Sequence, residues 1–181
     1  MRTRKARIGD VAAIHRLIAH YAGQGLLLPR SEADVRVHFR RFLVLEDERR
    51  VIGCVALEPY SAELAEIRSL AVDPEIRGRG LGARLVKAAL DEARRRRIAR
   101  VFAVTHAPEF FGRQGFTLST RWALPEKIAR DCRTCPKAST CELVAVVVAV
   151  WPERVALPVL TPAAKPASAC GEPGAAGRTT V

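Results

Sequence analysis

The stretch LAEIRSLAVDPEIRGRGLG, residues 64–82, decides how this chain folds. Residues 64–72 are mostly apolar and predict a strand that ends at the following Asp-Pro pair. A short glycine-rich turn comes next. Residues 81–97 then predict the longest helix of the chain, with Leu85, Val86, Ala89 and Ala93 on its inner side. In this order of elements, the backbone N–H groups of the turn and the N-terminus of the helix converge on one point, where an anion is stabilised.

The glycines and arginines of the turn suit this role. Gly80 and Gly82 let the backbone come close to a ligand because no Cβ stands in the way, and Arg77 and Arg79 add positive charge. The two glycines are also compatible with a tight turn that binds nothing. A dinucleotide-binding fingerprint is a poor match, because these glycines follow several hairpin strands, and a Walker loop would need Gly-Lys-Ser/Thr.

The chain before this stretch predicts a strand and two helices. Residues 4–8 are typical of a short strand, and Asp10 is placed to cap the first helix. The apolar side chains of that helix recur at helical spacing, at Val11, Ile14, Leu17, Ile18 and Tyr21. A loop with three consecutive leucines follows. Ser31 then begins a second helix, with Asp34 three residues later in a weaker form of the capping box.

Hairpin strands and a short helix account for the rest of the pattern. Residues 42–46 and 51–57 predict two strands joined by the charged turn 47–50. Beyond the long helix, the predicted elements are a strand at 100–105, a short helix at 109–114 that Gly115 stops, a strand opened by Phe116, and a fully apolar strand at 143–150.

Length and composition indicate one domain with a C-terminal tail. The chain has 181 residues, of which 49% are hydrophobic, enough for a packed core. We expect the domain to span residues 1–151. In residues 152–181 Pro, Ala, Gly and Thr dominate, and the last twenty of them are typical of disorder. No apolar run reaches the roughly 18 residues of a membrane span, and no apolar stretch follows the basic N-terminus, so we expect a cytoplasmic protein without a membrane partner.

The chain is strongly basic, with a formal net charge of +11 from 30 Lys and Arg against 19 Asp and Glu. The densest basic run, residues 94–97, lies at the end of the long helix, where cations complement the helix dipole. No aromatic residues interleave with these arginines as a stacking platform for nucleic acid would need. We therefore expect no nucleic-acid partner, and a basic surface that attracts small anionic ligands.

Two motifs resemble the Gcn5-related N-acetyltransferase (GNAT) superfamily. The first is Arg77-x-x-Gly80-x-Gly82 after the strand that ends in LAVDP, and the second is the FFxxxGF segment at 110–116. The resemblance covers roughly residues 1–150. It implies an α/β (α+β) fold with a mixed, mostly antiparallel central sheet, flanked by helices and splayed at the acetyl-CoA site. It also implies that the pyrophosphate lies on the turn and that the preceding strand pairs with pantetheine. The implied cofactor-binding residues are Leu70, Ala71, Val72, Arg77, Gly78, Arg79, Gly80, Leu81, Gly82 and Ala83.

Several segments are similar to the acetyltransferase domain of N-acetylglutamate synthases. They are DVAAI at 10–14, QGLLLPRS at 24–31, VIGCVAL at 51–57, AEIRSLAV at 65–72 and the Leu-Pro pair at 124–125. This resemblance implies transfer of acetyl from acetyl-CoA to the α-amine of L-glutamate, the first step of arginine biosynthesis. No amino-acid-kinase-like segment precedes the domain, so we expect no arginine inhibition through one. Other acceptors stay open, namely another amino acid, a polyamine or a protein lysine, and so does a non-catalytic CoA-binding sensor.

The resemblance also implies the residues that bind glutamate. Arg30 is the first candidate for a carboxylate, because a guanidinium binds it with two parallel hydrogen bonds. Leu28 and Ser69 are expected beside the substrate, and a second cation is expected near Lys127 or Arg130. Arg30 could instead be a surface residue that precedes a helix cap.

Acetyl transfer needs a base for the ammonium and an acid for the leaving thiolate. The resemblance assigns Glu66 as the base. Strand alternation puts Glu66, Arg68 and Leu70 on one face, so a simple Glu66–Arg68 pair is the competing interpretation. Many members use a tyrosine on the short helix as acid, but here that helix has none. Thr105 is the nearest counterpart of the hydroxyl that the synthases use, His106 is the alternative, and the thiolate could also leave unaided.

Three cysteines lie within ten residues, at Cys132, Cys135 and Cys141. A structural zinc would need a fourth ligand, such as Cys170, Cys54 or a histidine. The acetyl-transfer chemistry needs no metal, and we favour packing thiols over zinc or a redox pair. The expected partners are therefore acetyl-CoA and glutamate. The sequence does not determine the oligomeric state, and a homodimer stays open.

Overall fold

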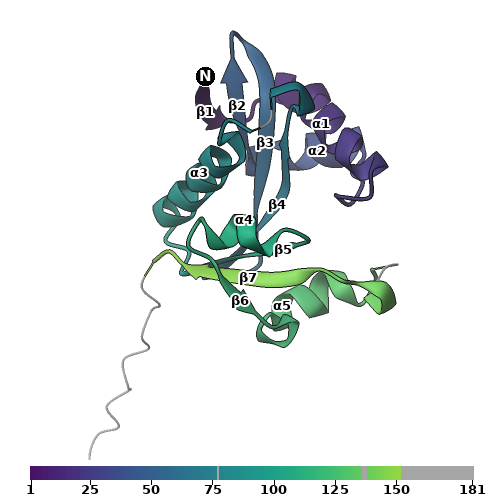
Figure 1. Cartoon of the computed structure of the whole chain (residues 1–181), viewed down its shortest axis with the longest axis vertical. Coiled ribbons are helices and arrows are strands. Elements are labelled where there is room, and N and C mark those ends of the chain that lie inside the picture. Colours follow the sequence, from purple (N-terminus) through teal and green to yellow (C-terminus); the bar gives the residue numbers. More distant parts are fainter. Residues whose placement is uncertain (77, 136–137, 152–181) are drawn as a thin grey trace, which may run out of the picture.

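The computed structural model describes residues 1–76, 78–135 and 138–151 (Figure 1). The predicted tail at 152–181, the turn residue Arg77 and the candidate zinc ligand Cys170 lie outside these residues.

A seven-stranded sheet forms the centre, in the order β1-β2-β3-β4-β5-β7-β6. The strands are β1 (Arg2–Lys5), β2 (Phe42–Asp47), β3 (Arg50–Pro59), β4 (Leu64–Val72), β5 (Arg100–Thr105), β6 (Thr117–Ser119) and β7 (Val144–Ala149). Neighbouring strands are antiparallel except β4 and β5, which are parallel. The predicted mixed, mostly antiparallel sheet is confirmed.

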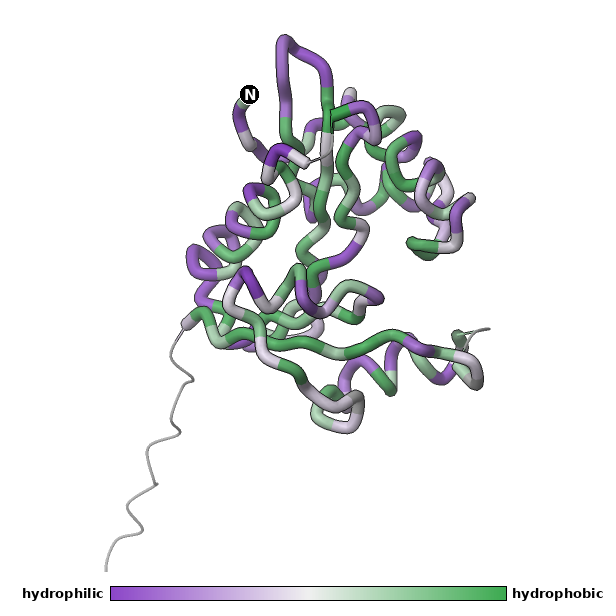
Figure 2. The backbone as a smooth tube through the Cα atoms, in the orientation of Figure 1, coloured by the Kyte–Doolittle hydropathy of each residue, from purple (hydrophilic) through white to green (hydrophobic). Residues whose placement is uncertain are grey.

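Helices cover both faces of this sheet (Figure 1). They are α1 (Val11–Gly23), α2 (Glu32–His38), α3 (Leu81–Arg95), α4 (Pro108–Gly112) and α5 (Pro125–Lys127), with short turns η1 (Ile8–Asp10), η2 (Phe39–Arg41), η3 (Pro74–Ile76), η4 (Arg121–Ala123), η5 (Ile128–Cys132) and η6 (Ala138–Thr140). The apolar side of α3 packs with one face of the sheet and that of α1 with the other, giving two main cores. Figure 2 shows the resulting pattern, with hydrophobic segments inside and hydrophilic helix faces outside. None of the helices in the described part is long and apolar enough to cross a membrane.

Local sequence explains most of the element boundaries. Ser31 caps α2 as predicted, since its hydroxyl accepts the Asp34 N–H at 3.0 Å. Helix α3 follows Gly80, whose φ of +70° is left-handed. It ends where Arg97 turns left-handed and the Ile98 N–H reaches back to the Ala93 carbonyl at 3.0 Å.

The N-terminal prediction was wrong in two details. The first strand ends at Lys5 rather than at Ile8, which begins the turn η1. Asp10 makes no side-chain cap bond to α1. Its carboxylate instead accepts the Arg7 N–H at 2.6 Å and both terminal nitrogens of Arg4. The Asp10 carboxylate therefore binds the Arg4 guanidinium, six residues earlier, in place of the N–H groups of α1.

Strands β4 and β5 separate along their length, as predicted. They pair only where residues 64–66 of β4 face residues 100–102 of β5. Beyond that point β4 continues to Val72 and β5 to Thr105 without pairing to each other, and the sheet splays open between them. The backbone of residues 67–72 thus lacks a β5 partner.

A bulge in β4 changes which side chains share a face. The register with β3 shifts between Cys54, which faces Ala71, and Ala56, which faces Arg68, and Ser69 takes a φ of +51°. As a result Leu70 packs in the α3-side core, with Ile67. The prediction that Leu70 shares the face of Glu66 was therefore wrong, because strict alternation leaves no place for the inserted residue.

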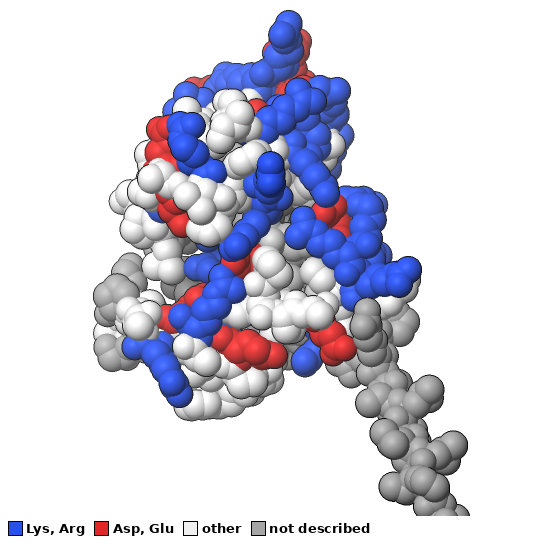
Figure 3. Space-filling view, turned by 180° about the vertical axis from the view of Figure 1, so that it is seen from behind, with Lys and Arg blue, Asp and Glu red and all other residues white. Residues whose placement is uncertain are grey.

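Acidic neighbours balance the basic run at the end of α3. Arg94 pairs with Asp91, while Arg95, Arg96 and Lys5 all reach Glu92. Burial opposes ionisation of Glu92, but hydrogen bonds from these three cations lower its pKa to about 2. Figure 3 shows Lys and Arg spread over the back of the molecule with acidic side chains among them.

Candidate active site

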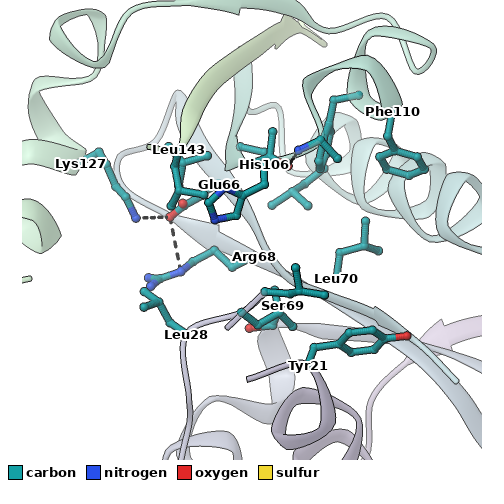
Figure 4. Close-up of a pocket in the computed structure, with 18 of the residues that line it drawn as sticks. Tyr21, Leu28, Glu66, Arg68, Ser69, Leu70, His106, Phe110, Lys127 and Leu143 are labelled. Atoms are coloured by element: carbon teal, nitrogen blue, oxygen red, sulfur yellow. Dashed lines mark hydrogen bonds and ion pairs between the residues drawn. The ribbon is translucent and has the colours of Figure 1, made fainter. Parts of the chain in front are cut away.

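A cavity of about 350 Å³ opens between the splayed strands β4 and β5 (Figure 4). Its walls come from β4, the end of β5, the loop after α1, helix α4 and the α5 region. The lining residues are Tyr21, 26–28, Arg30, 66–70, 103–107, Phe110, Phe111, Lys127 and Leu143. Seven expected site residues therefore meet in one place, namely Leu28, Arg30, Glu66, Ser69, Leu70, Thr105 and Lys127.

Glu66 lies at the floor of this cavity and is only 1% exposed. Its Oε2 atom is 2.7 Å from the Tyr60 hydroxyl, 2.9 Å from Lys127 Nζ and 3.5 Å from Arg68 Nε. Figure 4 shows the side chains of Lys127 and Arg68 reaching the Glu66 carboxylate from different sides. The competing interpretation is correct in that Glu66 and Arg68 pair, but Glu66 also lines the cavity. Within the described residues, these three contacts of the carboxylate all fall on Oε2, and Oε1 is the atom proposed below to meet a ligand.

Lys127 is less available than the sequence suggested. It is 6% exposed and its ammonium contacts two carboxylates, Glu66 at 2.9 Å and Asp131 at 2.7 Å. Asp131 follows one turn later in η5 and also receives Arg68 at 3.3 Å. The expected second cation for a substrate thus already has protein partners.

Arg130 lies outside this cavity. Its guanidinium binds Glu58, donates to the Pro59 carbonyl at 2.9 Å and stacks 4.6 Å from the centre of the Tyr60 ring. The hydrogen bond from Arg130 to Glu58 raises the pKa of Arg130. Arg41 also binds Glu58, which faces Glu66 across β3 and β4. Burial opposes ionisation of Glu58, but the hydrogen bonds from Arg41 and Arg130 lower its pKa.

Arg30 connects the cavity with a second one of about 390 Å³, lined by Arg30, Arg41, Arg68 and Arg130 among others. The Arg30 side chain is 13% exposed and forms an ion pair with Asp34 at 3.1 Å. Burial and the nearby Arg68 guanidinium lower the pKa of Arg30, although Asp34 opposes this. Two partly buried guanidinium groups that line the same cavity form a place suited to an anion.

Thr105 ends β5 at the edge of the cavity. Its Oγ1 accepts the Ala107 N–H at 3.0 Å, which leaves the hydroxyl hydrogen available for donation. His106, the alternative acid, also lines the cavity.

The glycine turn adjoins the cavity through Phe110. Gly78 and Gly80 both have positive φ, at 82° and 70°, and Arg84 is the first residue of α3 whose N–H bonds back, to Gly80 at 3.0 Å. The N–H groups of residues 81–83 therefore point out of the helix end. A Cβ on Gly82 would lie 3.4 Å from the Phe110 ring, which lines the cavity.

The strand before the turn is open on its β5 side. Of its expected pantetheine-pairing residues, Leu70 lines the cavity, while Ala71 and Val72 continue toward the turn. The Tyr21 hydroxyl donates to the Val72 carbonyl at 2.5 Å, so one acceptor of this edge is already used.

Sequence reasoning missed Tyr60 and Asp131. Their side chains meet at 2.5 Å directly behind Glu66. The spacing of Lys127 and Asp131, one helical turn apart, is a signal that could have indicated their pairing. The hairpin register could have placed Tyr60 near Glu66, because residue 58 faces 66 and residue 59 faces 65.

The cysteine cluster does not assemble a metal site in the described part of the chain. Cys132, Cys135 and Cys141 are partly exposed thiols. No group of three His, Cys, Asp or Glu side chains there could hold a metal ion.

Comparison with known proteins identifies a family for most of the folded part. A model of the acetyltransferase (GNAT) family matches residues 11–116. An uncharacterized N-acetyltransferase of Chlorobaculum tepidum is 41% identical over 144 residues, which are 80% of this chain and 93% of that protein. The amino-acid acetyltransferase of Mycobacterium tuberculosis is 40% identical over 117 residues, 63% of this chain and 67% of that protein.

Among solved structures, N-acetylglutamate synthase from Neisseria gonorrhoeae, in complex with coenzyme A and N-acetyl-glutamate, is similar with a TM-score of 0.76 and 32% identity. The match covers 83% of this chain but 35% of that one. This chain thus spans about a third of the length of the gonococcal protein.

Proposed function

The chain belongs to the GNAT acetyltransferase family, and we propose that it transfers the acetyl group of acetyl-CoA to the α-amine of L-glutamate. The product would be N-acetylglutamate, the first intermediate of arginine biosynthesis. The observation that carries the proposal is that Arg30, from the loop after α1, and Glu66, from β4, line the same cavity where the sheet splays open.

Acetyl-CoA would lie along the splay. Its pyrophosphate would bind the N–H groups of residues 78–83, where the helix dipole favours negative charge; Arg79 and Arg77 belong to the same expected set. The pantetheine arm would pair with the open edge of β4 at Leu70, Ala71 and Val72. The thioester would then lie near Thr105. The similar gonococcal synthase is solved with coenzyme A, which supports acetyl-CoA as the cofactor.

Glutamate would enter from the arginine-lined side. Its carboxylates would bind Arg30 and the neighbouring Arg68, with Leu28 and Ser69 beside the aliphatic part. Lys127 and Arg130 would support this region through their carboxylate partners. A polyamine fits poorly, because its ammonium groups would face two guanidinium groups.

The reaction follows from this arrangement. Glu66 Oε1 takes a proton from the ammonium, and the free amine attacks the thioester carbonyl. The tetrahedral intermediate collapses with release of the CoA thiolate. The Thr105 hydroxyl gives its proton to the thiolate and takes up the second proton of the amine. The amine loses two protons in all, one of which ends on the thiol.

The expected partners are small molecules and the expected location is cytoplasmic. Size-exclusion chromatography with light scattering tests whether the protein is a homodimer. The catalytic part is tested by release of free thiol from acetyl-CoA in the presence of each amino acid in turn. We expect the highest kcat/KM with L-glutamate. Turnover that favours another amine would overturn the glutamate assignment but keep the chemistry. Binding of acetyl-CoA with no turnover of any amine would indicate a CoA sensor instead.

A further inference from the structure

Each acetyl transfer leaves one surplus proton in the site. An alkylammonium loses two protons when it becomes an amide, and the departing thiolate takes up only one. The proposed base, Glu66, is 1% exposed and lies at the floor of a cavity that both substrates would fill. The second proton therefore needs a way out that does not cross the bound substrates.

The Tyr60 hydroxyl lies behind Glu66, between two carboxylates. It is 2.7 Å from Glu66 Oε2 and 2.5 Å from Asp131 Oδ2. A tyrosine has one hydroxyl hydrogen, so it donates to only one of these oxygens at a time and accepts whenever the other carries a proton. Neither Tyr60 nor Asp131 is among the residues that line the cavity, and the Asp131 side chain is 22% exposed. The three groups run from the buried base to solvent.

We propose that Tyr60 and Asp131 are the exit route for the proton that Glu66 takes from the acceptor amine. The inference rests on the proposed function, in which Glu66 is the base. The Glu66 carboxyl group first rotates so that its protonated oxygen faces the Tyr60 hydroxyl. The Glu66 O–H bond then breaks as its proton passes to the Tyr60 oxygen, and the Tyr60 hydrogen passes to Asp131 Oδ2. Tyr60 is neutral before and after, and Asp131 gives its proton to water. Rotation of the Tyr60 hydroxyl back toward Asp131 resets the route.

The charges around this route suit a neutral relay. Lys127 contacts both carboxylates, Arg68 reaches both, and Lys127 Nζ is 3.2 Å from the Tyr60 oxygen. Farther out, Arg130 stacks on the Tyr60 ring and, with Arg41, neutralises Glu58. Burial and the Glu66 charge raise the pKa of Tyr60, so the phenol keeps its proton. Although burial opposes it, bonds from Lys127 and Tyr60 lower the pKa of Asp131, which favours release to water.

Two variants break the route at different points. Tyr60→Phe removes the hydroxyl but keeps the ring, which packs 5.3 Å from the Phe102 ring and under Arg130. Asp131→Asn keeps the shape and an acceptor oxygen but cannot take up a proton. We expect each to lower kcat by about tenfold, less than loss of the base itself, with the KM for acetyl-CoA unchanged. The double variant should fall no further, because both residues act in one path.

A matched control is Asp91→Asn. Asp91 forms the same one-turn pair with Lys87, at 3.1 Å, on the exposed face of α3. It lies away from the cavity, and we expect wild-type kinetics. Circular dichroism melting curves check that all variants fold.

Chemical rescue separates a proton route from mere positioning of Glu66. Raising imidazole concentration at fixed pH and ionic strength should restore kcat of Tyr60→Phe and leave wild type unchanged, since a small buffer can carry the proton that the relay no longer carries. Wild-type kcat in both variants would overturn the proposal. So would a loss in both that no buffer restores, because that result indicates a structural role. An active Glu66→Gln enzyme would instead refute the proposed base, and with it the premise of the route.

Discussion

The two sides of the cavity differ in the groups that they offer, since one consists of backbone groups and the other of charged side chains. The side proposed for the cofactor is made of backbone groups, namely the open edge of β4 and the N–H groups at the start of α3, which are close in sequence. The side proposed for the acceptor is made of charged side chains that meet from the loop after α1, from β4 and from α5 and η5. Substitutions should therefore divide into two classes, because side-chain changes remove acceptor contacts directly, whereas only changes of backbone access can disturb the cofactor side.

The largest expected effect is at Glu66. Glu66→Gln removes the proposed base but keeps an amide of the same shape beside Lys127 and Arg68. We expect kcat to fall by about 10²–10⁴-fold, while the dissociation constant of acetyl-CoA stays the same. Thiol-release kinetics and isothermal titration measure the two quantities. Weaker acetyl-CoA binding to the same degree would contradict the division between the two sides.

Arg30→Ala should give the next largest effect. Charge-assisted hydrogen bonds contribute about 1.5–3 kcal/mol each, so loss of one carboxylate contact should raise the KM for glutamate at least about tenfold. Arg30→Lys should recover only part of this loss, because an ammonium cannot bind a carboxylate in the bidentate manner.

The control for this variant is Arg36→Ala. Arg36 is an exposed arginine of α2 that pairs with Glu32 at 2.9 Å and does not line the cavity. Its removal should leave both KM values unchanged. An equal rise in the KM for acetyl-CoA in Arg30→Ala would show that Arg30 serves both sides.

The same division explains what the sequence could predict. The cofactor side is local: a strand, glycines with positive φ and a helix follow one another within residues 64–95, and each has its own signal in the chain. The mixed, mostly antiparallel sheet, its splay and the Ser31 cap were also predicted or implied correctly, since they follow from capping chemistry and a family resemblance.

The acceptor side could be predicted only in part. Lys127 was identified as a cation, but its partner Glu66 lies 61 residues away, and Tyr60 meets Asp131 across 71 residues. Pairings at such separations depend on how the α5 region packs on the sheet, which no local pattern encodes. The bulge at Ser69 was missed for a similar reason, because the register of β4 is set by its pairing with β3.

Gly82→Ala perturbs the cofactor side alone. The added methyl group would lie 3.4 Å from Phe110, an ordinary contact, so the helix tolerates it, and alanine is favoured over glycine in a helix by up to about 1 kcal/mol. The same methyl group would stand where the pyrophosphate approaches the backbone. We expect a slightly higher melting temperature and a KM for acetyl-CoA raised several-fold, with the KM for glutamate unchanged. Gly9→Ala, whose added Cβ would meet nothing within 4 Å beyond its chain neighbours, is the matched control and should change neither KM.

Glu92→Gln should lower the stability of the fold without changing the binding of either substrate, because Glu92 lies near the C-terminal end of α3, away from the cavity. Its folded-state pKa of about 2 lies below the ordinary value of 4.5, so its ion pairs stabilise the fold above about pH 4.5 and lose that contribution as the pH falls toward 2. Two of its three cations are largely exposed, and solvent screening limits the effect to about 1 kcal/mol. Urea unfolding at pH 7 should therefore show a less stable variant, and the difference from wild type should shrink as the pH falls below 4.5. Both KM values should stay at the wild-type level, and a selective rise in the KM for acetyl-CoA would show that the position of the α3 N-terminus depends on how its far end is held.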